Sequence, residues 1–130
     1  MDICRITLIS SAGESGAYAD ETEQRLSIVS TGQIWFTSYR GKQPVRRIRC
    51  CSQKDTVRQI LNSLSQLDQD DPAVSEGKQT WEALVTDRDG KDHYLSGGRN
   101  DRTAGFSEML RANLAIRGLM AFDGPDFSGI

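Results

Sequence analysis

Alternation of apolar and polar residues divides this chain into two β-rich halves, each followed by one helix. In the first half, strands are predicted over residues 3–10 and within a hairpin near 24–39, and a helix over about 53–67. The second half repeats this order with a hairpin near 79–96 and a helix over about 104–117. The pattern predicts an α+β fold with a mainly antiparallel sheet of about five to six strands and two amphipathic helices.

The first hairpin is predicted to turn at Thr31-Gly32, because glycine supplies the positive φ that a tight turn needs. If these two residues form the loop, Val29 faces Ile34 across the two strands. Both faces of this hairpin then carry apolar side chains.

The second hairpin lies in TWEALVTDRDGKDHYLSGG, where Asp89-Gly90 is a favoured pair for a two-residue loop. That loop places Val85 opposite Tyr94. Tyr94 then joins Trp81 on one face of the hairpin, and we expect this face to lie in the core.

The helix over 53–67 has the clearest periodicity in the chain. Ser52 is its expected N-cap, and Thr103 is the expected N-cap of the second helix. The apolar stripe of the first helix consists of Val57, Ile60, Leu61, Leu64 and Leu67. We expect the stripe to pack on the sheet, with Leu61 and Trp81 in one core.

The 130 residues are predicted to form a single domain, 1–130, because neither half is large enough to bury a core of its own. Hydrophobic residues make up 37% of the chain and charged residues 26%, a composition typical of a folded domain. The chain has no predicted signal peptide or transmembrane run, and its three cysteines favour reduced thiols. These features indicate a cytoplasmic protein.

In its layout the chain resembles small α+β domains of unassigned role found in Gram-positive bacteria. The resemblance covers perhaps 100 residues, and the stretch from Trp81 to Gly97 is its most specific part. It implies a fold and no reaction. The adjacent Cys50 and Cys51 and the arginine-rich strand before them are not parts of that pattern.

The densest group of charges lies around the predicted strand PVRRIRC. Because neighbouring residues of a strand point to opposite faces, Arg47 and Arg49 project together, while Arg46 shares its face with Ile48 and Cys50. The candidate partner-binding residues are Tyr39, Arg40, Lys42, Arg46, Arg47 and Arg49. Arginine binds carboxylates and phosphates with paired hydrogen bonds. The alternative is an edge strand whose charges prevent it from pairing with other sheets.

A second candidate site is an anion site at the turn before the second helix. Free backbone N–H groups at a helix start can bind an anion, with two arginines nearby. The residues concerned are Gly97, Gly98, Arg99 and Arg102. The alternative is that the glycines serve only the geometry of the turn.

Metal binding and catalysis are less favoured. An EF-hand would need a distal glutamate that the Asp87 to Asp92 turn lacks, and aspartate and glycine suit a hairpin tip for backbone reasons. His93 is the only histidine, and no nucleophile motif accompanies it. Cys50 and Cys51 lack the spacing of a redox pair, and one thiol is expected to face the core. No catalytic residue, metal site or cofactor is predicted.

The net charge of −2, from 16 basic and 18 acidic residues, means that any basic function belongs to a local patch. Without a nucleophile–base pair, a metal set or a cofactor motif, the chain is expected to act by contact. The leading hypothesis is a non-enzymatic protein-binding module of the inhibitor, immunity or anti-defence kind, which blocks a larger partner through the basic strand. The alternative is a nucleic-acid or nucleotide-anion binding protein that uses the same strand.

Overall fold

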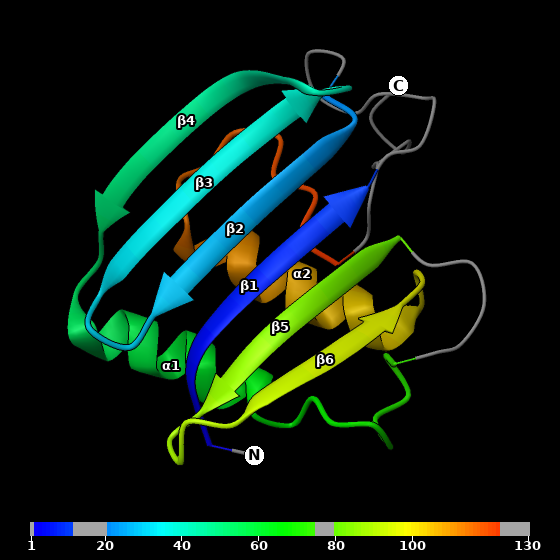
Figure 1. Ribbon diagram of the computed structural model, residues 1–130. Coiled ribbons are helices and arrows are strands. Elements are labelled where there is room, and N and C mark those ends of the chain that lie inside the picture. Colours follow the sequence, from blue (N-terminus) through cyan, green and yellow to red (C-terminus); the bar gives the residue numbers. More distant parts are fainter. Residues whose placement is uncertain (1, 12–20, 75–79, 123–130) are drawn as a thin grey trace.

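The structure, a computed structural model, describes residues 2–11, 21–74 and 80–122. In these residues a six-stranded antiparallel sheet has the strand order β4-β3-β2-β1-β5-β6, and two helices lie against one of its faces (Figure 1). The elements are β1 (Ile3–Ser11), β2 (Glu23–Val29), β3 (Gln33–Arg40), β4 (Gln43–Cys51), α1 (Lys54–Leu64), β5 (Trp81–Asp87), β6 (Asp92–Gly97) and α2 (Asp101–Asn113). The predicted α+β fold is confirmed.

Strand β1 joins the two halves of the sequence into one sheet. Ile6 pairs with Ile28 of β2 on one side and with Val85 of β5 on the other. All three side chains are buried, so the centre of the sheet is also the centre of the core. This arrangement leaves β4 and β6 as the two edge strands.

The core lies between the sheet and the layer formed by α1, α2 and the segment 114–122. Leu61 of α1 and Trp81 of β5 both belong to it, as predicted. The Trp81 ring meets Phe122 edge to face at 5.0 Å, and its indole N–H donates to the carbonyl oxygen of Gly98 at 3.1 Å. Neither helix of the described residues is long and apolar enough to cross a membrane.

The predicted register of the first hairpin is wrong by one residue. Ile28 pairs with Ile34, and the loop contains three residues, Ser30 to Gly32, instead of two. Gly32 has a φ of 102°, the left-handed conformation that such loops place at their third position. The slip puts Ile28 and Ile34 together in the core.

The second hairpin shows the same error for the same reason. Leu84 pairs with Tyr94 around a loop whose Gly90 has a φ of 84°. Tyr94 therefore lies on the face opposite Trp81 and is 56% exposed, while Leu95 takes the expected place in the core. A one-residue shift in register reverses the direction of every side chain on a strand.

The helix ends also differ from the prediction. Helix α1 has Gln53 at its N-cap, without a side-chain hydrogen bond, in place of Ser52. Helix α2 begins three residues earlier than predicted because Asn100 and Thr103 form a reciprocal capping box. Thr103 is thus the third helical residue and not the N-cap.

Replacing Leu61 with alanine is expected to lower the free energy of unfolding by about 2–5 kcal/mol, because the side chain is buried and would leave a cavity. Denaturant unfolding measures this loss. Gln59→Ala, at an exposed position of the same helix, is the control and should change stability by less than about 0.5 kcal/mol. Equal effects of the two substitutions would contradict the packing of α1 described above.

Candidate functional site

The second face of the sheet, opposite the helices, is not covered by any described element (Figure 1). We call it the open face; it consists of the side chains that point away from α1 and α2. One row of cross-strand neighbours crosses all six strands of this face: Arg49, Trp35, Ser27, Thr7, Leu84 and Tyr94. Leu84 is 47% exposed, so β5 presents an aliphatic side chain on this face while its neighbours Ala83 and Val85 are buried on the other.

The charges of the open face are separated along this row. Arg47 and Arg49 lie at the β4 end, and both are exposed. Glu82 and Asp92 lie at the other end, on β5 and β6. Between them Arg5 of β1 is exposed on the same face. Arg25 of β2 is already engaged, since its guanidinium lies over the Tyr39 ring at 5.1 Å and pairs with Glu23 at 2.9 Å.

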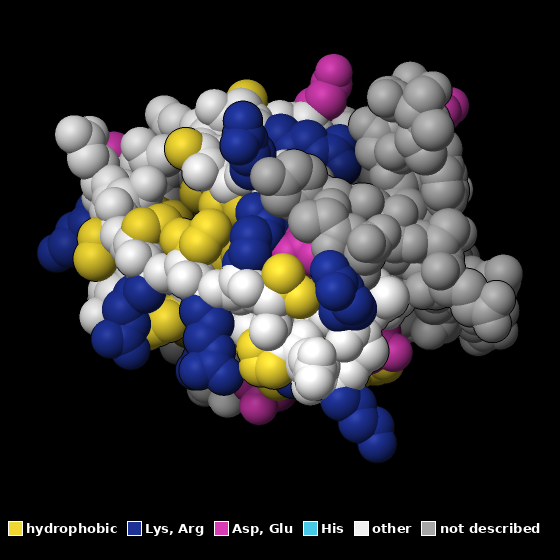
Figure 2. Space-filling model, turned by 90° about the horizontal axis from the view of Figure 1, so that it is seen from above, with side chains coloured by type: hydrophobic (Ala, Val, Ile, Leu, Met, Phe, Trp, Pro, Cys, Tyr) yellow, Lys and Arg dark blue, Asp and Glu magenta, His cyan; other side chains and the backbone are white. Residues whose placement is uncertain are grey.

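Strand β4 is accessible on both of its faces as well as along its edge. Seven of its nine residues are exposed, including Val45 at 40%, and Arg46 and Ile48 are half-buried. Figure 2, which views the molecule from above, shows exposed hydrophobic side chains with Lys and Arg side chains on both sides of them. Cys50 and Cys51 are both exposed, so the expectation that one thiol faces the core is wrong.

The six predicted partner-binding residues do not form one surface. Arg47 and Arg49 project together on the open face, as predicted, and Tyr39 lies on the same face. Arg40 and Lys42 lie at the exposed β3–β4 turn. Arg46 points to the helix side, where it has a different role.

Arg46 forms an ion pair with the fully buried Glu21. Its guanidinium donates two hydrogen bonds to the Glu21 carboxylate, at 2.7 and 2.6 Å, and lies over the Phe36 ring at 5.0 Å. Burial by itself would raise the pKa of Glu21, but hydrogen bonds from Arg46, Ser38 and Gln24 outweigh it and hold the pKa below its usual value. Arg46 is therefore half-buried and held by an internal ion pair, whereas Arg47 and Arg49 are the exposed arginines of this strand.

The same network reaches the end of the described chain. The Gln24 amide donates to Glu21 at 3.1 Å and to the carbonyl oxygen of Gly118 at 2.8 Å. Its oxygen accepts from the backbone N–H of Met120 at 2.7 Å. These bonds attach the segment 114–122 to β2.

The contacts around the predicted anion site favour the alternative that its glycines serve only the geometry of the turn. Gly97 is buried, and a Cβ there would collide with the Trp81 ring. The N–H of Thr103 is bonded to the Asn100 side chain, so the helix start is capped from within. Arg102 lies over the Phe106 ring at 4.7 Å and pairs with Asp71 at 3.4 Å.

The group Asp87, Asp89, Asp92 and His93 was not favoured as a metal or acid–base site from the sequence, and the structure brings two of its members, His93 and Asp87, together. Their side chains meet at 2.8 Å across the three-residue loop. The hydrogen bond from His93 is the main reason that the pKa of Asp87 lies below its usual value, and backbone N–H groups add to it. Among the residues that the structure describes, no serine, threonine or cysteine lines the adjacent hollow of about 450 Å³, and no group of three or more acidic, His or Cys side chains is placed to hold a metal.

Arg46→Gln should lower the free energy of unfolding by about 3–5 kcal/mol, because it leaves the Glu21 carboxylate buried without its cation. Arg47→Gln, the neighbouring exposed position, is the matched control and should change stability by less than about 0.5 kcal/mol. Chemical denaturation distinguishes the two. Similar losses for both variants would show that Arg46 is not an internal residue.

The lowered pKa of Glu21 also predicts a component of acid stability. A carboxyl whose pKa is lower in the folded state stabilises the fold above its usual pKa, 4.5, and this contribution disappears as the pH falls through the folded value. We expect the free energy of unfolding of the wild-type chain to fall more steeply below about pH 4.5 than that of Glu21→Gln. The control Glu108→Gln, at an exposed position, should show the same dependence of unfolding free energy on pH as the wild-type chain. If Glu21→Gln also showed that dependence, the contribution assigned to Glu21 would be refuted.

The open face thus offers Trp35, Leu84 and Tyr94 in a row that also contains Ser27 and Thr7, with two arginines at its β4 end. Tyr94 was missed as a surface residue because the predicted register placed it in the core, and the sequence did not decide which apolar face of the first hairpin would be covered, and hence whether Trp35 would be covered. Their chemistry suits contact with another molecule, since aromatic and arginine side chains are enriched at interfaces. In comparisons with known proteins, no family model, no curated protein and no solved structure matches the chain.

Proposed function

We propose that the chain is a non-enzymatic protein-binding module of the inhibitor type, which docks through β4 and the open face on an acidic surface of a larger partner. The observation that carries this proposal is the position of Arg47 and Arg49 beside Trp35, at the exposed edge of an uncovered sheet face. Arginine and tryptophan are the side chains that most often dominate binding energy at protein interfaces.

The charge of the β4 end supports an acidic partner. Arg47 and Arg49 form no ion pair with any residue in the described ranges. Two neighbouring arginines without internal partners attract carboxylates and raise the rate of association. Edge protection alone normally needs fewer charges than this strand carries.

The opposite end of the open face argues against nucleic acid as the partner. Glu82 and Asp92 lie on β5 and β6, and they would repel phosphates laid across the sheet. The exposed Leu84 and Tyr94 lie on these same two strands and add apolar surface, which is typical of protein interfaces. A basic end at β4, and an end at β5 and β6 that combines acidic and apolar side chains, together fit a protein surface with the complementary distribution of charge.

The decisive change is the double variant Arg47→Gln/Arg49→Gln. It should keep the fold and lower the affinity for the partner by one to several kcal/mol, roughly tenfold or more, because these charges are desolvated in the complex. The partner is identified by cross-linked capture from the producing cell, and its affinity is then measured with purified components at two salt concentrations. Lys54→Gln/Arg58→Gln, which removes the same charge from a different surface, is the control.

Three outcomes have clear meanings. Binding lost in the β4 variant and kept in the control supports the proposal. Equal binding by both variants contradicts it and leaves edge protection as the role of the arginines. If the wild-type chain binds single-stranded DNA with an affinity that falls steeply with salt, and the β4 variant does not bind it, the partner is nucleic acid and not a protein.

A further inference from the structure

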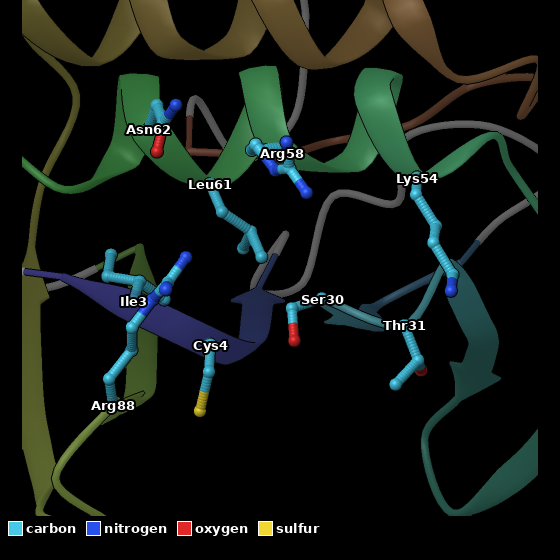
Figure 3. Close-up of a pocket in the computed structure, with 9 residues that line it drawn as sticks. All are labelled: Ile3, Cys4, Ser30, Thr31, Lys54, Arg58, Leu61, Asn62 and Arg88. Atoms are coloured by element: carbon cyan, nitrogen blue, oxygen red, sulfur yellow. The ribbon is translucent and has the colours of Figure 1, made fainter.

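A hollow of about 480 Å³ lies at the end of the sheet where the β2–β3 and β5–β6 turns approach α1 (Figure 3). Three cations from two different elements line it: Lys54 and Arg58 of α1, and Arg88 of the β5–β6 turn. None of the described residues that line it is acidic. The hollow is therefore electropositive although the whole chain carries a net charge of −2.

Two of these cations are not neutralised by the described part of the chain. Lys54 and Arg58 form no ion pair within residues 2–11, 21–74 and 80–122. Arg88 pairs with Asp2 at 3.4 Å, but both side chains are more than 60% exposed, so this pair is weak. Figure 3 shows Lys54 and Arg58 extending from α1 toward the strand ends, while Arg88 approaches from the opposite side.

Neutral groups complete the lining in a way that suits a phosphorylated organic molecule. The Ser30 and Thr31 hydroxyls and the Asn62 amide supply hydrogen-bond donors for anionic oxygens. Ile3 and Leu61, which are 4% and 3% exposed, form an apolar floor with only a small accessible surface. Ligand pockets of roughly 300–1,000 Å³ commonly combine an apolar lining with a few placed polar groups.

The β2–β3 turn is held against the start of α1 by the backbone. The N–H of Ser52 donates to the carbonyl oxygen of Gly32 at 2.9 Å. A Cβ at Gly32 would approach the Ser52 carbonyl oxygen to 2.6 Å, so the turn and the helix start are in close contact. This contact places Thr31 beside Lys54 before any ligand arrives, which reduces the ordering cost of binding.

We propose that this hollow is a binding site for a small organic phosphate. Its phosphate groups are held by Lys54, Arg58 and Arg88, and its organic part lies against Ile3 and Leu61. The site is separate from the open face, and the proposal does not depend on the protein-binding function.

The test uses the full chain with three probes: pyrophosphate, adenosine diphosphate and adenosine. Calorimetric titration should show saturable binding of the two phosphorylated probes and none of adenosine. The double variant Lys54→Gln/Arg58→Gln should lower the affinity for both phosphorylated probes by tenfold or more. Arg47→Gln/Arg49→Gln, which removes the same charge from β4, should bind as the wild-type chain does. Equal weakening by the two variants, absence of pyrophosphate binding, or adenosine binding as tightly as adenosine diphosphate would each overturn the proposal.

Amide NMR spectra locate the probe independently of the variants. Pyrophosphate should shift the backbone resonances of Thr31, Lys54 and Arg88. If only the resonances of Gly98 and Arg102 shifted, the anion would bind at the turn before α2, and its assignment to this hollow would be overturned.

Discussion

The Glu21 carboxylate has no exposed surface, so its charge has to be neutralised inside the fold. The cation that neutralises it is Arg46, which belongs to the edge strand β4. Arg46 crosses to Glu21, and Gln24 continues the network to the segment 114–122. The pair therefore links the entry to β2, the outer strand β4 and the last described residues. Because strand neighbours alternate, the inward direction of Arg46 also sends Arg47 and Arg49 outward. The register of β4 against β3 therefore places Arg46 in the ion pair with Glu21 and, at the same time, places Arg47 and Arg49 on the proposed interface.

The one-sided layering of the sheet decides where binding surfaces can lie. Both helices and the segment 114–122 cover the same face, so polar and apolar side chains of the other face stay accessible. The hollow beside α1 lies at the strand ends, where two turns approach the helix. A partner protein on the open face and an organic phosphate in the hollow would therefore use different side chains. Charge-matched variants of the two surfaces can separate their roles.

Both hairpins illustrate how one loop residue changes the surface of a protein. In each, a glycine at the third loop position adopts a positive φ, and the strand that follows shifts by one residue from the two-residue expectation. Trp35 and Tyr94 consequently lie on the open face and not where the shorter loops would place them. The dipeptides Thr31-Gly32 and Asp89-Gly90 are compatible with either loop length, and packing of Ile34 and Leu95 into the core selects the longer one.

The sequence by itself determined the class of fold, the two helices and the core membership of Leu61 and Trp81, because periodic burial is a local property of each segment. It also determined that Arg47 and Arg49 share a face, since alternation follows from the strand alone. Only the tertiary structure decided that Arg46 is internal, because its partner Glu21 is 25 residues away and lies outside any local pattern. The same holds for Lys54, Arg58 and Arg88, which meet at one hollow because α1 packs against the end of the sheet where the β5–β6 turn lies. Contacts between distant segments depend on how the layers pack, and no short-range periodicity encodes that packing.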